Sequence, residues 1–214
     1  MTSKPAGSPV WIELLSTDPD SSAPFYEAAI GVEVTEPKKE FGGYRDVLRN
    51  GKVVAGLIRE KEKSRSAWRL WLRSDDVDAT LAAVPEHGGE VLEGPDDVEG
   101  LGRRAVIRDP SGAETGVWQL HGFPGIEVEN EPGAPCWYEL HTTDRFAETV
   151  DFYRAAFGWD IAVLGDTDDF RMVTFGEDDA ALAGIYDASA QAPGGPSRWQ
   201  VYFLVADVDA TSQA

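Results

Sequence analysis

Positive charge, cysteine and long apolar runs are all scarce in this sequence. The 214 residues include 19 Lys and Arg against 38 Asp and Glu, which gives a formal net charge of −19. A phosphate backbone or an anionic membrane surface would repel such a chain, so we expect neither nucleic acid nor a membrane as a partner. No window approaches the roughly 18 apolar residues of a membrane-spanning helix, and the opening MTSKPAGSPV lacks the apolar centre of a signal peptide. We therefore expect a cytoplasmic protein.

Several signatures of catalytic or redox chemistry are also missing. The one cysteine, Cys136, excludes an internal disulfide and agrees with a reducing compartment. It neighbours Trp137 on an expected strand, without an obvious base, which favours packing over nucleophilic catalysis. The sequence shows no Ser-His-Asp order, no Gly-rich phosphate loop and no Cys-x-x-Cys spacing.

What the chain does contain is an internal repeat. The segment PVWIELLSTD (9–18) returns as PCWYELHTTD (135–144). Three further segments return in the same order: APFYEAAIGVEV as VDFYRAAFGWDI, VAGLI as LAGIY, and DVDAT unchanged. Two copies of one domain are therefore present. We predict a first domain over 8–122, an acidic linker with Pro and Gly over 123–134, and a second domain over 135–214.

Each copy begins with a strand, a helix and three more strands. The first strand alternates, with Ile12 and Leu14 on one face. Helices are expected between Asp18 and Gly31 and, in the second copy, between Asp144 and Gly158. In the first copy the following strands are predicted near 32–37, 43–49 and 52–60, with Asn50-Gly51 as a hairpin turn.

The same βαβββ order recurs within the first copy. A strand over 67–75 and a helix over 76–87 are followed by strands near 90–93, 102–108 and 113–120, with a turn at 109–112. The second copy has only the counterparts of that strand (197–207) and of the helix start. About 40 residues are missing relative to the first copy, so we expect the native protein to be longer than this chain.

These modules resemble the vicinal oxygen chelate superfamily of glyoxalases, bleomycin resistance proteins and extradiol dioxygenases. The resemblance is carried by Phe25-Tyr26 and Phe152-Tyr153 in the first helices, by the helix start Asp75 to Asp78, and by the Asp-Pro-x-Gly hairpin Asp109 to Gly112. The tandem arrangement is most similar to the two-domain glyoxalase-like proteins of actinobacteria. It implies an α+β fold in which paired βαβββ modules form curved mixed sheets, or cups, with the second domain incomplete at its C-terminus.

The resemblance also implies where a metal would bind. Metal-using members carry a His on the first strand, a His or Gln on the fifth and a Glu on the eighth, and the metal acts as a Lewis acid. The matching positions here hold Trp11, Arg69 and Gly116 in the first copy and Trp137 and Gln200 in the second. Trp, Arg and Gly offer no usable lone pair, so the first cup lacks all three ligands, and in the second cup only Gln200 is a permissible ligand. We therefore expect no metal and no other cofactor.

Strand alternation places aromatic and polar side chains toward the two cups. The predicted ligand-binding residues are Trp11, Glu13, Arg69, Trp71 and Trp118 in the first cup, and Trp137, Glu139, His141, Gln200 and Tyr202 in the second. A buried Glu13 needs a partner, for which we expect Arg69. Glu139 and His141 are the candidates for catalysis, whereas His87 is expected in solvent and His121 at the edge of the linker, neither with a functional role.

Two interpretations of the seven tryptophans stay open. They could fill interiors by packing, or they could form the walls of a small-molecule pocket. We favour a metal-independent protein that binds an aromatic or polyketide-like small molecule, in a sequestration, resistance or pathway accessory role. The alternative is a glyoxalase-, dioxygenase- or hydroxylase-type enzyme that acts through the second cup, where Glu139 and His141 would transfer a proton or hold a metal. A homodimer is left open.

Overall fold

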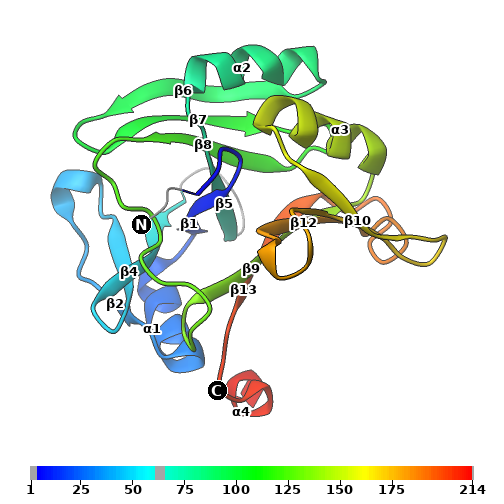
Figure 1. Cartoon of the computed structure of the whole chain (residues 1–214). Coiled ribbons are helices and arrows are strands. Elements are labelled where there is room, and N and C mark those ends of the chain that lie inside the picture. Colours follow the sequence, from blue (N-terminus) through cyan, green and yellow to red (C-terminus); the bar gives the residue numbers. More distant parts are fainter. Residues whose placement is uncertain (1–3, 61–65, 214) are drawn as a thin grey trace. The chain divides into compact units, whose positions relative to one another are not determined.

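The computed structural model describes residues 4–60 and 66–213. The start of the N-terminal stretch discussed above and Ala214, the end of the second predicted domain, lie outside the described residues. Within them the chain forms two mixed sheets, with strand orders β2-β3-β4-β1-β5-β8-β7-β6 and β10-β11-β12-β9-β13 (Figure 1). The predicted α+β class is confirmed.

The first repeat supplies all strands of the larger sheet. Its elements are β1 (Pro9–Ser16), α1 (Pro19–Ile30), β2 (Glu33–Val34), β3 (Arg45–Arg49), β4 (Lys52–Arg59), β5 (Ala67–Arg73), α2 (Val77–Glu86), β6 (Glu90–Val98), β7 (Gly102–Arg108) and β8 (Glu114–Leu120), with a short 3₁₀ turn at Lys39–Phe41. The second repeat supplies β9 (Pro135–Thr142), α3 (Phe146–Phe157), β10 (Ile161–Asp166), β11 (Arg171–Phe175), β12 (Ala183–Asp187), β13 (Arg198–Phe203) and α4 (Val208–Gln213), with a 3₁₀ turn at Asp178–Ala180.

Helix boundaries follow the local signals in the sequence. Asp18 is the N-cap of α1, and Gly31 ends that helix in the left-handed conformation at φ 70°. In α2 the N-cap carboxylate of Asp76 accepts a hydrogen bond of 3.0 Å from the amide of Ala79. In α3 the N-cap position falls on Arg145, one residue after the expected Asp144. Gly158 ends α3 as predicted.

The described residues divide into two compact units, and each unit takes segments from both repeats. The first unit combines residues up to Val10, Leu70–Phe123 and Tyr138–Gln200. The second combines Trp11–Arg69, Pro124–Trp137 and the chain from Val201 onward. The predicted domain limits at 122 and 135 are limits of sequence repetition, and as folding units they stay a prediction.

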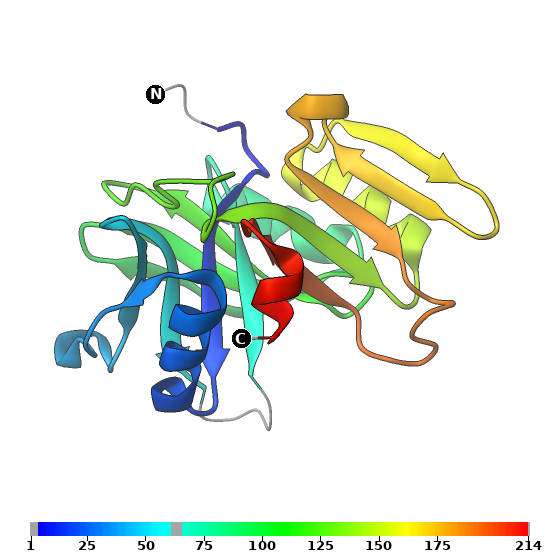
Figure 2. The same cartoon turned by 90° about the horizontal axis from the view of Figure 1, so that it is seen from below.

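In the first unit, helices α2 and α3 lie side by side (Figure 1), and α2 covers β6, β7 and β8. Figure 2 shows α3 behind the strands β10 to β12 of the smaller sheet. The core around α3 is aromatic: Phe152 and Tyr153 of this helix are fully buried, and Trp159 is 2% exposed. The indole of Trp159 donates a hydrogen bond of 3.0 Å to the carbonyl of Gly7.

A buried polar network crosses this core. One carboxylate oxygen of Asp109, in the Asp-Pro-x-Gly turn, accepts hydrogen bonds from the amides of Ser111 and Ala113, and the other accepts one of 2.9 Å from the Tyr153 hydroxyl. Thr115 lies 3.2 Å from the same hydroxyl and accepts a bond of 2.7 Å from the indole of Trp199. The turn is thereby fixed to α3.

In the second unit, α1 is less covered than its counterpart α3. Phe25 is 60% exposed, whereas the aligned Phe152 is 0% exposed. The hydroxyl of Tyr26 accepts a hydrogen bond of 3.0 Å from the indole of Trp68. No helix within the described ranges is long and apolar enough to cross a membrane.

Candidate functional site

In the second unit, Trp11, Glu13 and Tyr44 form a cluster beside the strands β1 and β4. These strands pair in parallel, with Glu13 opposite Gly56. Tyr44, just before β3, lies over that glycine: a Cβ placed on Gly56 would be 1.8 Å from the Tyr44 hydroxyl. The indole of Trp11 donates a hydrogen bond of 3.0 Å to this hydroxyl, which is also hydrogen-bonded to Glu13. A phenol ring of the protein itself therefore occupies this face of the sheet.

Burial raises the pKa of Tyr44 well above its ordinary value, and the nearby Glu13 charge raises it further. The hydroxyl thus keeps its proton and can donate to the carboxylate. Tyr44 contacts the predicted residues Trp11 and Glu13 but was not itself predicted. The predicted pairing of Glu13 with Arg69 stays a prediction.

The remaining first-cup residues, Trp71 and Trp118, lie in the first unit. Trp71 of β5 is opposite Gly116 of β8, and a Cβ on that glycine would be 2.2 Å from the Trp71 ring. The rings of Trp71 and Trp118 contact each other at 5.1 Å between centroids, and the Arg104 guanidinium lies 5.3 Å from the Trp71 ring. Gly116, at a position where the family resemblance implies a metal ligand, is thus covered by an indole.

The first-cup tryptophans are almost completely buried. Trp11 and Trp71 are each 1% exposed and Trp118 is 5% exposed. Rings buried to this extent favour the packing interpretation for these three residues. Ligand binding by them stays a prediction that would require the rings to move.

The second repeat presents a different face. Its strand β9 alternates strictly from Tyr138 to Thr142, so Glu139 and His141 share the face opposite to the buried Leu140. The Nε2 atom of His141 lies 2.7 Å from Oε1 of Glu139, and the two side chains are 22% and 14% exposed. The carboxylate and imidazole that the sequence singled out are therefore hydrogen-bonded to each other and reach solvent.

Aromatic rings flank this pair. Tyr186 of β12 lies opposite His141 in the sheet, with its ring centroid 5.4 Å from the imidazole. Phe170 is 42% exposed and lies 5.9 Å from the Tyr186 ring. The amide of Gln191 donates a hydrogen bond of 2.6 Å to the Tyr186 hydroxyl. Tyr186, Phe170 and Gln191 were not among the predicted site residues.

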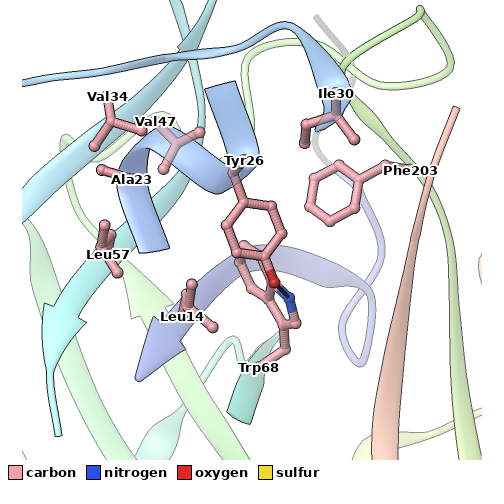
Figure 3. Close-up of a pocket in the computed structure, with 9 residues that line it drawn as sticks. All are labelled: Leu14, Ala23, Tyr26, Ile30, Val34, Val47, Leu57, Trp68 and Phe203. Atoms are coloured by element: carbon pink, nitrogen blue, oxygen red, sulfur yellow. Dashed lines mark hydrogen bonds between the residues drawn. The ribbon is translucent and has the colours of Figure 1, made fainter. Parts of the chain in front are cut away.

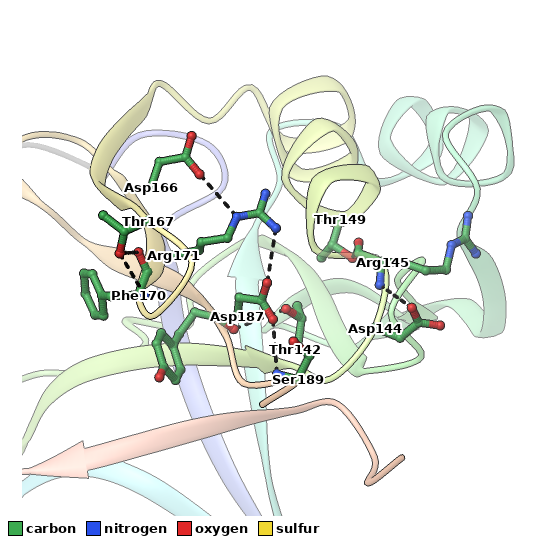
Figure 4. A network of polar contacts seen from close by, with 11 residues as sticks. Thr142, Asp144, Arg145, Thr149, Asp166, Thr167, Phe170, Arg171, Asp187 and Ser189 are labelled. Carbon is green, nitrogen blue, oxygen red and sulfur yellow. Dashed lines mark hydrogen bonds and ion pairs between the residues drawn. The ribbon is translucent and has the colours of Figure 1, made fainter. Parts of the chain in front are cut away.

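A polar network holds the strands beside these rings (Figure 4). Arg171 reaches the carboxylates of Asp166 on β10 and Asp187 on β12, each at 3.2 Å. Its guanidinium also lies 4.7 Å from the Phe146 ring. Asp187 in turn accepts from the amide of Ser189. These contacts fix the ends of β10, β11 and β12 next to Phe170 and Tyr186.

The other predicted second-cup residues are divided between the units. Gln200 belongs to the first unit, and Trp137 and Tyr202 belong to the second. Tyr202 is 42% exposed on β13, and its carbonyl accepts a weak bond from the thiol of Cys136 at 3.4 Å. His87 is exposed, as expected, and His121 at the edge of the linker is exposed too.

An apolar pocket in the second unit is too small for a ligand. It is lined by Leu14, Ala23, Tyr26, Ile30, Val34, Val47, Leu57, Trp68 and Phe203 (Figure 3). Its interior of about 10 Å³ has room for roughly one water molecule. This pocket is a packing defect under α1 rather than a binding site.

The residues present do not fit a divalent metal. In the part of the chain that the structure describes, no three His, Cys, Asp or Glu side chains come together in a way that could hold an ion. Glu139 and His141 together provide two donor side chains, fewer than the three that protein metal sites of catalytic type use.

Comparisons with known proteins agree with this architecture. A model of the glyoxalase, bleomycin resistance protein and dioxygenase superfamily matches residues 8–117. The anthracycline biosynthesis protein DnrV of Streptomyces peucetius is 34% identical to this chain, over 99% of this chain and 82% of DnrV. CFP32 of Mycobacterium tuberculosis, which its name assigns provisionally to the glyoxylases, is 32% identical over 96% of this chain and 80% of its own.

Solved structures show the same fold at lower identity. The Mn(II)-bound glyoxalase from Novosphingobium aromaticivorans matches with a TM-score of 0.68 at 19% identity, over 96% of this chain and 68% of that chain. A 4-hydroxymandelate synthase variant from Streptomyces coelicolor matches with a TM-score of 0.61 at 15% identity, over 98% and 74% of the two chains. On the family match and these relatives, the chain belongs to the glyoxalase, bleomycin resistance protein and dioxygenase superfamily.

Proposed function

We propose that this protein binds an aromatic or polyketide-like small molecule on the face of the second repeat that carries Glu139 and His141. Binding would need no protein-bound metal. The observation that carries the proposal is the group formed by Glu139, His141, Tyr186 and Phe170, in which a polar pair is flanked by partly exposed rings. The similarity to a protein named for anthracycline biosynthesis supports an aromatic ligand. Sequestration, resistance and a pathway accessory role all require this binding step.

The chemistry of the face suits such a ligand. Small-molecule sites are mostly apolar and aromatic, with a few polar groups that fix orientation. Stacked or edge-on aromatic pairs contribute about 0.5–1.5 kcal/mol beyond the burial of their area. The network around Arg171 holds the strands in place, so little conformational entropy should be lost when a ligand binds.

Binding is tested by isothermal titration of the protein with a panel of planar aromatic compounds, 2-naphthol and anthraquinone among them. We expect binding that Tyr186→Ala and Phe170→Ala each weaken about fivefold to tenfold, the loss expected for one aromatic contact. Phe41→Ala is the matched control, since Phe41 is 59% exposed in the first repeat. No binding across the panel, or equal loss in all three variants, would overturn the proposal.

Metal independence has its own measurement. Treatment with a chelator followed by dialysis should leave the affinity for the aromatic compound unchanged, because the described residues do not bring three donor side chains together. Elemental analysis should find no stoichiometric transition metal in the purified protein. A full equivalent of iron, manganese, nickel or zinc, with loss of binding on its removal, would contradict this part of the proposal.

A second candidate function is favoured by the 2.7 Å bond between Glu139 and His141. A carboxylate that orients an imidazole is a common arrangement for proton transfer, which suits a glyoxalase-, dioxygenase- or hydroxylase-type enzyme. Mass spectrometry of each bound panel compound after incubation tests this function. A product that His141→Asn no longer forms would establish an enzyme, and unchanged compounds throughout would leave binding alone.

A further inference from the structure

The smaller sheet ends in an apolar strand whose outer side is open. β10 pairs with β11 on one side, and no other strand of the described residues pairs with it (Figure 1). Val163 is 67% exposed and Leu164 is 63% exposed. The register with β11 shifts between Val163 and Gly165, so Leu164 is the extra residue of a bulge and two consecutive apolar side chains reach solvent. An exposed apolar edge of this kind is one with which another polypeptide can pair.

The hydrogen-bond pattern shows which backbone groups of β10 are directed away from β11. The amide of Gly176 donates a hydrogen bond of 2.9 Å to the carbonyl of Asp160. Hydrogen-bonded residues alternate along an antiparallel pair, so Ala162 exchanges its backbone bonds with β11, while Ile161 and Val163 direct theirs to the open side. These two residues therefore offer N–H and C=O groups at the spacing that an added strand requires.

The first repeat protects the same edge. Continued without a gap, the repeat alignment places Glu36 at the position of Val163. Pro37 likewise corresponds to Leu164. The edge strand there, β2, has two residues instead of six. A charged side chain and a proline, which has no N–H, are devices by which natural proteins prevent pairing at a sheet edge. The second repeat has neither at these positions.

Carboxylates flank the apolar part of β10. Asp160 precedes the strand and Asp166 ends it, while Asp168 and Asp169 follow in the hairpin, and all four are exposed. Between 155 and 180 the sequence has seven acidic residues and one cation. A polypeptide with an apolar centre and with lysine or arginine at its ends would complement this edge in both composition and charge.

A second copy of the chain would complement the edge less well. If two copies of β10 paired antiparallel about Val163, Asp160 of each copy would lie opposite Asp166 of the other. Like charges directly opposite each other destabilise a strand pair. Two chains with a net charge of −19 each would also repel each other at longer range. The charges therefore favour a basic partner over self-association.

We propose that the open edge of β10 binds an extended segment of a basic partner protein by strand addition. Apolar residues of that segment lie beside Val163 and Leu164, and its lysine or arginine residues lie next to the flanking carboxylates. Main-chain hydrogen bonds to Ile161 and Val163 hold the segment, while its side chains set the specificity. This inference does not depend on the proposed binding of a small molecule, because it uses the backbone and side chains of β10.

Fluorescence anisotropy with a labelled peptide, blocked at both termini, tests the proposal. The probe has two lysines at each end and alternating valine and threonine between them. We expect it to bind, and the same peptide with glutamate in place of lysine to bind at least about tenfold more weakly, since favourable charge pairs become repulsive. N-methylation of the central amides removes hydrogen-bond donors without changing the charge, and it should abolish binding.

Val163→Pro removes an outward N–H from the protein side. Proline is tolerated on an edge strand where the N–H faces solvent, so the variant should fold. It should weaken binding of the lysine peptide about threefold to tenfold, the loss expected for one backbone hydrogen bond. Val208→Pro is the matched control. Val208 is 71% exposed at the first position of α4, where proline is also tolerated, so this variant should leave the affinity unchanged.

The proposal is wrong if the lysine peptide does not bind or if its N-methylated form binds equally well, and neither result needs a variant to fold. Equal affinities of folded Val163→Pro and the unaltered protein would place the peptide elsewhere and would also overturn it. A dimer in analytical ultracentrifugation that Val163→Pro dissociates would make a second copy the occupant of the edge instead of a basic partner.

Discussion

At the scale of single residues, glycines opposite large rings decide how the sheet faces are filled. Gly116 lies against the ring of Trp71, and Gly56 lies against the hydroxyl of Tyr44. A side chain at either position would occupy space that a buried aromatic residue already fills. These two glycines are required by close approach rather than by backbone conformation.

Gly116→Ala should therefore destabilise the protein. The new methyl group would stand 2.2 Å from the Trp71 ring, which is 1% exposed and held against Trp118. Overpacking of this kind costs about 1–3 kcal/mol. Urea unfolding measures the loss, and the Trp71→Phe background provides the control, because a smaller ring should tolerate the methyl group. Equal losses in both backgrounds would show that the Trp71 contact is not the cause.

Tyr44 was not among the residues that the sequence predicted for the first cup. It lies in the segment 43–49 that was predicted as a strand, but cup residues were assigned only on the first, fifth and eighth strands of the repeat. Its aligned counterpart is Phe170, yet Gly56 lies opposite Asp46 whereas Gly184 lies opposite Thr174, and this two-residue difference in register is a property of strand pairing. The pairing of Glu139 with His141, by contrast, follows from residues two apart on one strand.

At the scale of elements, the turn at Asp109 and helix α3 are joined by one buried carboxylate. Burial raises the pKa of Asp109 above its ordinary value, and hydrogen bonds from Ser111 and Tyr153 partly oppose that rise. The folded protein then binds a proton at Asp109 more readily than the unfolded chain. Its unfolding free energy falls as pH rises from the unfolded pKa through the folded one, and this contribution is constant above that window.

Tyr153→Phe should extend this pH window upward. Without the Tyr153 hydroxyl, the pKa of Asp109 rises further, so the variant loses more unfolding free energy at pH 7 than at pH 4. We expect a deficit of about 1.5–3 kcal/mol at pH 7, the range for a hydrogen bond to a charged group, and a smaller deficit in acid. Urea unfolding at several pH values between 4 and 8 measures it.

The repeat supplies a matched control for this prediction. Tyr26 is the counterpart of Tyr153, and its hydroxyl accepts from the indole of Trp68. Tyr26→Phe should cost about 1 kcal/mol, the value for a neutral hydrogen bond, at every pH. A deficit of Tyr153→Phe that is equally independent of pH would contradict the role given to Asp109.

Most elements of this fold were predictable because their signals are local. β7 has the expected limits of 102–108. α1 ends where Gly31 adopts the left-handed conformation, and Asn50-Gly51 forms the hairpin turn with both φ angles positive. β6 is longer than expected, Glu90–Val98 instead of 90–93, since its acidic second half carries no strand signal. Pairing with β7 imposes that half of the strand.

At the scale of the whole molecule, the grouping of elements into compact units had no signal in the sequence. The repeats can be read from matching segments, but the first unit joins α2 of one repeat to α3 of the other. That grouping depends on Phe152 packing near Gly89 and on the bond between Tyr153 and Asp109. Such contacts between distant segments leave no period or motif behind.

The charge of the molecule makes a prediction at the same scale. Even if each of the 19 cations paired with one carboxylate, 19 of the 38 acidic groups would have no cation, and their repulsion opposes the compact state. Salt weakens exposed ion pairs as well, but each of these contributes only about 0–1 kcal/mol. Repulsion should therefore dominate, and added NaCl should raise the Tm at pH 7.

The dependence on concentration identifies the cause. The Debye length falls from about 30 Å at 0.01 M to about 8 Å at 0.15 M salt, so screening should deliver most of the increase below about 0.2 M. An increase that continues linearly to 1 M would instead indicate salt exclusion from the protein surface. Thermal unfolding across this range measures the effect, with roughly 2–4 °C expected for each 1 kcal/mol gained. A Tm that falls with NaCl would mean that the ion pairs around residues such as Arg171 outweigh the repulsion.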